Sequence, residues 1–262
     1  MSAPSTASLD GRVAVITGAS RGIGEAIARA YGRAGAKLVL AARKAEALEG
    51  VAESLRESGA DAIAVPTHTG EADSVQALVA TATERFGSVD IVVNNAATNP
   101  HYGPFLDATP EMWDKTFDIN VKGYFRVISA AAPGMLERKW GRIINVASIA
   151  GLQAQPGMGV YGCSKAAVIM MTRALAVELA PRGVTVNAIA PGFVKTKFSS
   201  VLWQTPQVHD RLIEAIPARR MAEPEEIAGI ASYLASDEAA FTTGAVFEVD
   251  GGQRAASGVR LG

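Results

Sequence analysis

Tyr161 and Lys165 stand four positions apart in the segment "VYGCSKAAV". Residues at i and i+4 lie on the same face of a helix, so the phenol and the ammonium can meet. Free tyrosine has a pKa of about 10, and bringing it to neutrality requires about 4 kcal/mol of preferential stabilisation of the phenolate. An ammonium about 4 Å away, at an effective dielectric constant near 20, supplies a comparable energy. We therefore predict that this pair exchanges protons near pH 7.

Two further side chains can complete a site for carbonyl reduction, in which a hydride goes to carbon and a proton to oxygen. Ser148 ends the apolar segment "RIINVAS" and is a candidate donor to the charge that develops on that oxygen. Asn120, in "DKTFDINVKGYF", can hold Lys165 or a proton-relay water through its side-chain amide. The alternatives are surface packing for the helical pair, a helix cap for Ser148 and local backbone binding for Asn120.

A glycine-rich turn follows the first apolar segment, in "RVAVITGASRGIGEAIARAYGRAG". Gly18, Gly22 and Gly24 permit a tight turn and a close approach to a pyrophosphate, at which the following helix directs its N–H groups. The spacing is G-x-x-x-G-x-G and not the more widespread G-x-G-x-x-G. Its place at the first strand-to-helix turn nevertheless favours a dinucleotide site over a purely structural turn.

The second apolar segment indicates which dinucleotide binds. In "KLVLAARKAE", Ala42 and Arg43 occupy the place where an NAD site presents a carboxylate to the ribose. Arg43 can instead pair with a 2′-phosphate, helped by Arg21 from the glycine-rich turn. The sequence therefore favours NADP(H) over NAD(H), the alternative being that both arginines are solvated surface charges.

Apolar segments rich in valine and isoleucine alternate with patterns of helical period. This order predicts an α/β single-domain Rossmann fold, a doubly wound seven-stranded parallel sheet with helices on both faces. The predicted strands lie in 12–18, 36–43, 62–67, 89–95, 141–148, 183–192 and 245–252, and the helices in 22–34, 44–58, 71–86, 110–138, 159–181 and 224–236.

We predict one domain over residues 10–252, between a disordered segment 1–9 and a tail 253–262. Residues 193–220 interrupt the alternation and are expected to form a substrate lid. Its large apolar side chains suit an apolar ketone or aldehyde, or alternatively pack the lid onto the core. They are Phe193, Phe198, Val201, Leu202 and Trp203.

Composition excludes several classes of function. A net charge of −1 gives no basic stripe for nucleic acid. The single cysteine, Cys163, excludes a disulfide framework or a multi-cysteine metal site and is expected to be a small buried hydrophobe, so we predict no metal. The start lacks an apolar signal core and no run approaches about 18 apolar residues, which favours a cytoplasmic protein without a membrane partner.

Taken together, "TGASRGIG", "NNAA", Asn120, Ser148, "YGCSK" and "APG" resemble the short-chain dehydrogenase/reductase family over residues 10–252. The resemblance implies that Tyr161 is the catalytic acid and base, and that Lys165 lowers its pKa and binds the nicotinamide ribose. It also implies that Ser148 polarises the carbonyl and that Asn120 supports a proton relay.

The resemblance further implies a set of cofactor contacts and pocket walls. The sequence departs from the family's pattern at Ala97, where a glycine is usual, and at His68, where an aspartate near the adenine is usual. By family position, His101, Tyr102, Gln153, Gln155 and Met158 wall the substrate pocket. The implied cofactor-binding residues are Gly18, Ser20, Arg21, Gly22, Ile23, Gly24, Arg43, His68, Asn95, Ala96, Tyr161, Lys165, Pro191, Gly192, Val194 and Thr196.

More narrowly, residues 95–125 and "APGFVKTKFSSVLW" are similar to the NADPH-dependent carbonyl and retinal reductases of the animal peroxisomal type, known as family member four. This likeness implies an NADPH-dependent carbonyl reductase. The helix after Tyr161 is apolar on more than one face, and the family more often uses it between subunits, so we expect a homotetramer.

Two other functions stay open at this point. A 3-oxoacyl-[acyl-carrier-protein] reductase would need basic residues beside the mouth of the site, for which Lys195, Lys197, Arg219 and Arg220 are available. A dinucleotide-sensing binding protein without chemistry would use the same fold but would not require the catalytic set.

Overall fold

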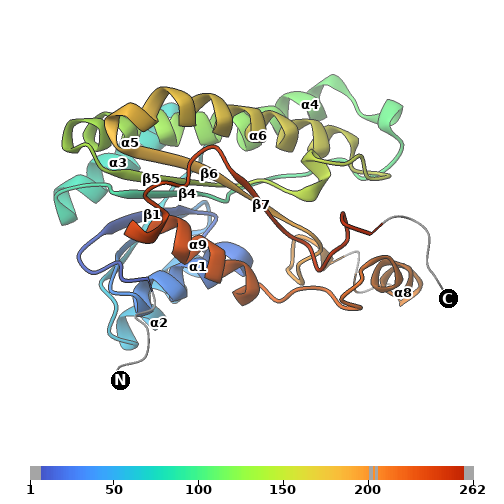
Figure 1. Ribbon diagram of the computed structural model, residues 1–262, viewed down its shortest axis with the longest axis horizontal. Helices are drawn as coiled ribbons and strands as arrows, with labels where there is room; N and C mark the ends of the chain where they lie inside the picture. The colour runs from blue at the N-terminus through green and yellow to red at the C-terminus, as the bar shows by residue number, and fades with distance from the viewer. Residues whose placement is uncertain (1–6, 201–202, 204–205, 257–262) are drawn as a thin grey trace.

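The protein is described by a computed structural model that covers residues 7–200, 203 and 206–256. Its centre is one parallel sheet in the order β3-β2-β1-β4-β5-β6-β7, which confirms the predicted fold class (Figure 1). The strands are β1 (Val13–Thr17), β2 (Lys37–Ala42), β3 (Ala62–Pro66), β4 (Ile91–Asn94), β5 (Gly141–Val146), β6 (Val184–Pro191) and β7 (Val246–Val249).

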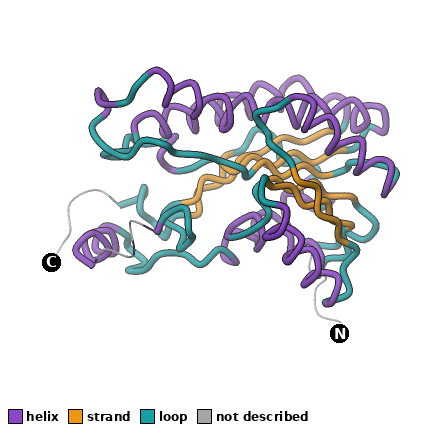
Figure 2. Tube along the Cα trace, turned by 180° about the vertical axis from the view of Figure 1, so that it is seen from behind, coloured by secondary structure: helices purple, strands orange, loops and turns teal. Residues whose placement is uncertain are grey.

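Helices cover both faces of the sheet, which explains why its central strands are buried throughout and mostly apolar. Every residue of β1, β4, β5 and β6 is buried. Figure 2 shows the sheet between two helical layers. One layer holds α3 (Ala72–Phe86), α5 (Gly123–Arg138) and α6 (Gly159–Leu179), and the other holds α1 (Gly22–Arg33), α2 (Ala45–Glu57) and α9 (Glu225–Ala235).

The strand order reverses between β1 and β4. From β1 the chain adds β2 and β3 on one side and then crosses to β4 on the other. The loops after β1 and β4 therefore leave in opposite directions and open a crevice at the carboxyl ends of these strands, where doubly wound sheets bind ligands.

The helix predicted over 110–138 is interrupted. α4 (Pro110–Phe117) is capped by Thr109, whose hydroxyl accepts a hydrogen bond from the Met112 amide. A π-helical turn over Asp118–Lys122 separates α4 from α5. A π turn carries an extra residue per turn and so changes which side chains face inward. Here it leaves Asn120 fully buried. Apolar periodicity did not indicate this interruption because the flanking pattern continues.

The predicted disordered segment 1–9 extends too far toward the domain, because its last residue is ordered. Leu9 is buried, and its amide donates to the Ala34 carbonyl at 2.8 Å. An apolar side chain beside the first strand gains more from packing against the end of α1 than it loses in conformational freedom. Residues 1–6 and 257–262 lie outside the described residues.

The described part of the predicted lid, residues 193–200, 203 and 206–220, lies beyond the end of the sheet and includes α8 (Pro206–Ala215) (Figure 1). Val194 pairs with Ala222 in an isolated parallel bridge that closes the excursion at its base. Its own apolar cluster contains Leu212, Ile216 and Met221, against which Phe193 and Trp203 pack. Val201 and Leu202 lie outside the described residues.

The outer face of α6 carries an exposed apolar stripe. Cys163 lies on this face, so the expectation that it is buried is wrong. Cys163 is exposed, and Met170 and Val177 further along the helix are 61% and 78% exposed. By length and composition, Gly159–Arg182 also qualifies as a candidate membrane span, with 44% of its window buried in the structure. Its inner face packs on β6 and carries Tyr161 and Lys165, so burial against the sheet accounts for that part of its apolar character.

Candidate active site

The glycine-rich turn between β1 and α1 depends on its glycines at two close contacts. Gly18 has a φ of +67°, and a Cβ there would lie 2.7 Å from the Asn95 amide nitrogen. A Cβ on Gly24 would lie 2.4 Å from the Gly18 carbonyl oxygen. No side chain caps the N-terminus of α1, so its first N–H groups are available to an anion.

Asn95 and Ala96, directly after β4, are tied to the same turn. The Thr17 hydroxyl accepts from the amides of Asn95 at 2.9 Å and Ala96 at 3.1 Å. The Asn95 side chain donates to the carbonyls of Thr17 and Gly18. These bonds hold the loops after β1 and β4 together at the point where the strand order reverses.

One cavity of about 620 Å³ runs from this turn to Tyr161. It brings together residues from the carboxyl ends of six strands, as the fold predicts. Two of the predicted catalytic and cofactor-binding residues do not line it: Asn120, which is fully buried, and Gly24, which serves the packing of the turn. The predicted residues that line it are Gly18, Ser20, Arg21, Gly22, Ile23, Arg43, His68, Asn95, Ala96, Ser148, Tyr161, Lys165, Pro191, Gly192, Val194 and Thr196.

The end of this cavity beside β2 is basic. Arg21, Arg43 and Lys44 line it, and among the described residues none of the three takes part in an ion pair. Ala42 ends β2 without a carboxylate. Lys44 was not predicted from the sequence, although it directly follows Arg43.

His68 lines the cavity at the end of β3, and its ring is turned back on its own loop. Its Nδ1 accepts a hydrogen bond from the Gly70 amide at 3.2 Å and lies 3.7 Å from the Glu71 carboxylate. A contact between His68 and an adenine stays a prediction.

Two glycines allow the loop that carries Ser148 to pack closely against α6, which carries Tyr161. A Cβ on Gly151 would lie 2.6 Å from the carbonyl carbon of Lys165, and a Cβ on Gly162 would lie 2.8 Å from the Ala150 carbonyl oxygen. The loop after β5 therefore rests directly on the backbone of α6. The Ser148 hydroxyl also accepts from the Ala150 amide at 3.1 Å, so it caps a short turn as well as facing the cavity.

Lys165 is held by partners that the sequence did not reveal. Its ammonium nitrogen donates to the Val146 carbonyl at 2.7 Å and to the Tyr124 hydroxyl at 3.1 Å, and it lies 5.6 Å from the centre of the Tyr161 ring. Tyr124 in turn donates to the Val146 carbonyl. Tyr124 follows Asn120 by four residues, a spacing that offered a signal for this role.

Burial dominates the protonation of this pair. It raises the pKa of Tyr161 to about 12, against an opposing hydrogen bond from Ser148, and lowers the pKa of Lys165 to about 7. This differs from the sequence-based expectation that the ammonium alone makes the phenol acidic near neutral pH. The expectation omitted desolvation, which disfavours both charged forms when the two groups are almost fully buried.

Asn120 anchors the site without contacting Lys165. Its amide nitrogen donates to the Thr98 carbonyl at 2.9 Å and the Ser164 hydroxyl at 3.0 Å, and its amide oxygen accepts from the Thr98 amide. Ser164 donates to the carbonyl of Tyr161 at 2.7 Å. The predicted amide contact to Lys165 is not formed, because the Asn120 amide oxygen, to which an ammonium would donate, accepts from the Thr98 amide, and Lys165 donates to Tyr124 and Val146 instead. Support of a proton relay by Asn120 stays a prediction.

The predicted pocket walls are partly correct. Tyr102, Gln155 and Met158 line the cavity, whereas His101 and Gln153 do not. His101 instead bonds through its ring to the Pro104 carbonyl at 2.9 Å, and Gln153 is exposed.

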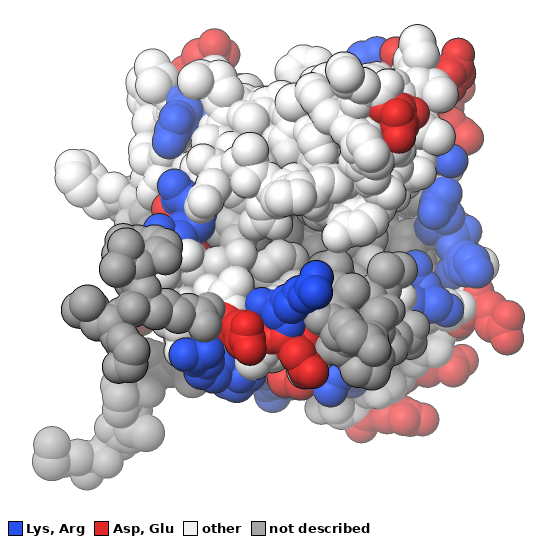
Figure 3. Space-filling model, turned by 90° about the vertical axis from the view of Figure 1, so that its right-hand side faces the viewer, with Lys and Arg blue, Asp and Glu red and all other residues white. Residues whose placement is uncertain are grey.

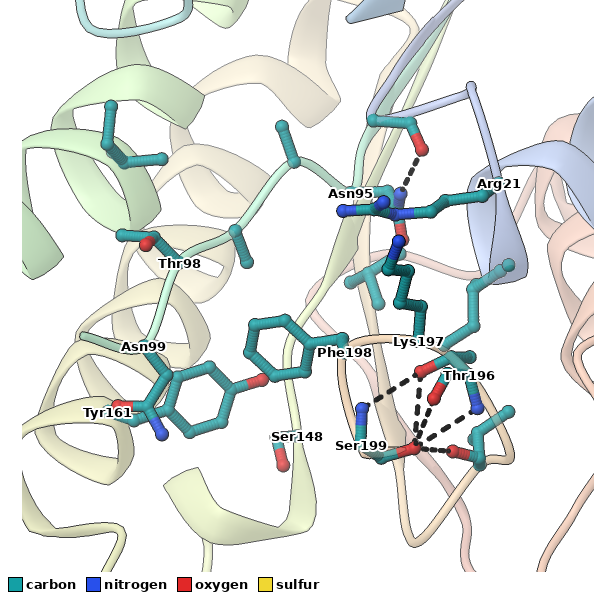
Figure 4. Close-up of a pocket in the computed structure, with 18 of the residues that line it drawn as sticks. Arg21, Asn95, Thr98, Asn99, Ser148, Tyr161, Thr196, Lys197, Phe198 and Ser199 are labelled. Atoms are coloured by element: carbon teal, nitrogen blue, oxygen red, sulfur yellow. Dashed lines mark hydrogen bonds between the residues drawn. The ribbon is translucent and has the colours of Figure 1, made fainter. Parts of the chain in front are cut away.

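The lid contributes aromatic side chains to the cavity. Phe193 and Phe198 line it, and the ring of Phe198 lies 5.9 Å from that of Tyr161 (Figure 4). Trp203 does not line it, because its indole donates to the Thr196 carbonyl within the lid. Ala97, the departure from the family's glycine, lies on the cavity wall.

Comparison with known proteins places this geometry in a family. Residues 18–254 match the family model described as enoyl-(acyl carrier protein) reductase. The chain is 41% identical over 244 residues to human dehydrogenase/reductase SDR family member 4, covering 93% of this chain and 88% of the relative. The chain is a short-chain dehydrogenase/reductase. It is also 42% identical to the oxidoreductase UcpA of Salmonella typhimurium, covering 97% and 98% of the two chains.

Solved structures of similar proteins agree with this fold. A gluconate 5-dehydrogenase from Burkholderia cenocepacia, in complex with NADP and tartrate, superposes with a TM-score of 0.91 at 34% identity, covering 95% of this chain and 98% of that chain. A short-chain type dehydrogenase/reductase from Mycobacterium ulcerans gives a TM-score of 0.92 at 31% identity, covering 96% and 92%.

Proposed function

We propose that this short-chain dehydrogenase/reductase interconverts a ketone or aldehyde and an alcohol with NADP(H), using Tyr161 as acid and base. The observation that carries the proposal is the continuous cavity that joins the glycine-rich turn to Tyr161, Ser148 and Lys165. A cavity of about 620 Å³ lies within the range of small-molecule and cofactor sites.

The residues present fit a nicotinamide dinucleotide. The glycine-rich turn and the uncapped N-terminus of α1 would hold the pyrophosphate, because Gly18 and Gly22 line the cavity there without side chains. Pro191, Gly192 and Thr196 also line the cavity and would hold the nicotinamide end. When bound, the dinucleotide supplies or accepts the hydride.

The protein side of the proposed reaction is a proton transfer at the Tyr161 hydroxyl. With a pKa of about 12, the phenol is protonated at neutral pH and so is in the form that donates to a developing alkoxide. Ser148 would donate a second hydrogen bond to the same oxygen. Lys165, fixed by Val146 and Tyr124, would favour the phenolate while the proton is away.

This arrangement favours carbonyl reduction over alcohol oxidation at neutral pH. Reduction needs the protonated phenol, whereas oxidation needs the phenolate, which burial disfavours. The proposed oxidation rate therefore rises with pH as the phenolate becomes populated.

The preference for NADP(H) rests on Arg21, Arg43 and Lys44 at the β2 end of the cavity, where no carboxylate ends the strand. A guanidinium matches a 2′-phosphate in geometry and charge. The bound NADP of the Burkholderia cenocepacia relative is consistent with this preference.

The walls at the other end favour a small uncharged substrate. Tyr102, Met158, Phe193 and Phe198 supply mainly apolar surface there. We therefore propose a largely apolar carbonyl compound as the substrate class.

A 3-oxoacyl-[acyl-carrier-protein] reductase is the alternative; the matching family model shares its carrier protein but is described as an enoyl reductase, which acts on a C=C bond and not on a carbonyl. Against it, Lys195 pairs with Glu223 at 3.9 Å, and Arg220 makes two 2.6 Å contacts with Glu226. Figure 3 shows charges of both signs side by side on the lower part of one face. Two of the four basic residues named for an acidic carrier are therefore already paired with carboxylates.

The proposal is tested by following oxidation of NADPH and NADH with a panel of free ketones, aldehydes and one 3-oxoacyl thioester. We expect turnover of free carbonyls with NADPH, and a loss of at least about 100-fold in Tyr161→Phe, which keeps the ring against Phe198 but removes the acid. We expect Arg43→Asp to shift the kcat/KM ratio toward NADH by removing a phosphate partner.

Three outcomes would contradict the proposal. Turnover of the thioester alone would support the carrier-protein alternative. Binding of NADPH without turnover of any carbonyl would support a dinucleotide-sensing protein. An unchanged cofactor ratio in Arg43→Asp would refute the assignment of the 2′-phosphate site.

A further inference from the structure

Asn99 lines the cavity at its substrate end, on the segment that follows β4. Figure 4 places it in the same part of the view as Tyr161, away from Arg21 and Asn95 at the glycine-rich turn. Neither composition nor motif spacing marked this residue.

The amide of Asn99 is poorly partnered for a buried group. Its nitrogen donates to the sulfur of Met158 at 3.5 Å, and a thioether is a weak acceptor. Its oxygen is fully buried and has no hydrogen-bond partner. Most buried polar atoms in proteins have a hydrogen-bond partner, and a buried acceptor without one destabilises the folded protein.

The unpartnered oxygen of Asn99 differs from the others in its position at the cavity. Of the buried side-chain atoms without a partner among the described residues, the one on a cavity-lining residue belongs to Asn99. The others belong to Asn94, Thr185, Gln253 and Arg254.

Neighbouring backbone groups are already committed and do not compete for the amide. Thr98 is bonded through both its N–H and its carbonyl to Asn120. The Met158 amide donates to the Gln155 carbonyl at 3.1 Å. Rotation of the Asn99 amide about its Cβ–Cγ bond breaks only the weak contact to sulfur, and it can turn the oxygen toward the cavity.

A hydroxyl group matches this amide, because it can donate to the oxygen and accept from the nitrogen. A carboxylate can only accept, and the neutral amide offers it no charge. The reacting carbonyl oxygen is assigned to Tyr161 and Ser148, so Asn99 remains for a second polar group of the substrate, and its place in the same part of Figure 4 as Tyr161 points to a group close to the reacting carbon.

We propose that Asn99 selects carbonyl substrates that carry a hydroxyl group next to the reacting carbonyl, that is, α-hydroxy ketones and the corresponding vicinal diols. This inference rests on the proposed carbonyl reduction and narrows its substrate class from apolar carbonyls to those with one neighbouring hydroxyl.

The test compares acetoin with 2-butanone, which differ by that hydroxyl, in the wild type and in Asn99→Leu. We expect the ratio of kcat/KM for acetoin to kcat/KM for 2-butanone to fall about 10-fold in Asn99→Leu, the size of one net hydrogen bond. Thr185→Val is the matched control, because it removes an unpartnered buried oxygen outside the cavity, and it should leave the ratio unchanged.

An unchanged ratio in Asn99→Leu, or an equal fall in Thr185→Val, would overturn the inference. Failure of the proposed function is a separate result, in which neither ketone is reduced. In that event, each ketone is titrated into the NADP⁺-bound protein and its binding is followed by ligand-observed NMR. The inference holds if acetoin binds more tightly than 2-butanone to the wild type and loses this advantage in Asn99→Leu. Any other result overturns it.

Discussion

At the residue scale, the site consists of buried polar groups whose partners set their protonation. Lys165 has two protein partners, Tyr124 and the Val146 carbonyl, yet desolvation still lowers its pKa to about 7. Burial acts in the opposite direction on the pKa of Tyr161, raising it to about 12, because the charged form of tyrosine is the deprotonated one. Both side chains are therefore driven toward their neutral forms.

The lowered pKa of Lys165 predicts a pH-dependent stability. Between pH 7 and 10.5 the unfolded chain binds more protons at this lysine than the folded chain, so stability rises with pH across that window. Below pH 7 both states are protonated, and the cost of burying the charge is constant. We expect the unfolding free energy of the wild type, relative to Lys165→Met, to increase from pH 7 to pH 9.

Urea denaturation of the two proteins at several pH values measures this difference. The comparison cancels the titration of groups that the two proteins share. A difference that stays flat or falls over this range would mean that the lysine keeps its ordinary pKa in the folded protein.

At the scale of elements, two departures from regular helix and strand position the catalytic groups. The π turn between α4 and α5 buries Asn120, which ties Thr98 after β4 to Ser164 on α6. The loop after β5 rests on α6 through Gly151. Together they fix three elements around Tyr161 without any direct bond between its hydroxyl and the π turn.

Gly151→Ala tests the second of these contacts. The new methyl group would lie 2.6 Å from the Lys165 carbonyl carbon and 2.7 Å from the Ala166 amide nitrogen, so the loop must move away from α6. We expect destabilisation of about 1–3 kcal/mol, typical of overpacking, and a lower kcat because Ser148 moves with the loop.

The matched control is Gly50→Ala in α2, where an added Cβ meets nothing within 4 Å. Alanine is the better helix former, so this change should stabilise the protein by about 0.5–1 kcal/mol. Thermal unfolding and steady-state kinetics measure both variants. Equal effects of the two changes would show that Gly151 is not a packing contact.

At the scale of the whole molecule, the layer that holds α5 and α6 leaves large apolar side chains exposed. Phe125, Met170 and Val177 are 54%, 61% and 78% exposed. Because exposed apolar stripes of this kind are characteristic of subunit contacts, we propose that the protein is a symmetric homotetramer.

Val177→Lys tests the proposed assembly. We expect the wild type to have about four times the chain mass of 27.2 kDa by light scattering, and the variant to shift to a smaller species because a lysine would be buried without a partner. Glu53→Lys on α2, on the opposite face of the sheet, should not change the mass. A wild-type mass of one chain would refute the tetramer.

The sequence by itself determined the sheet, the glycine-rich turn, the basic end of the cavity and the Tyr161–Lys165 pair. These features depend on local periodicity and on short spacings along the chain, which physical rules connect directly to geometry. Only the tertiary structure decided the π turn at Asn120, the role of Tyr124, the burial that sets both pKa values and the unpartnered amide of Asn99. Each of these depends on groups brought together from distant segments, and desolvation is a property of the packed environment that no spacing along the chain records.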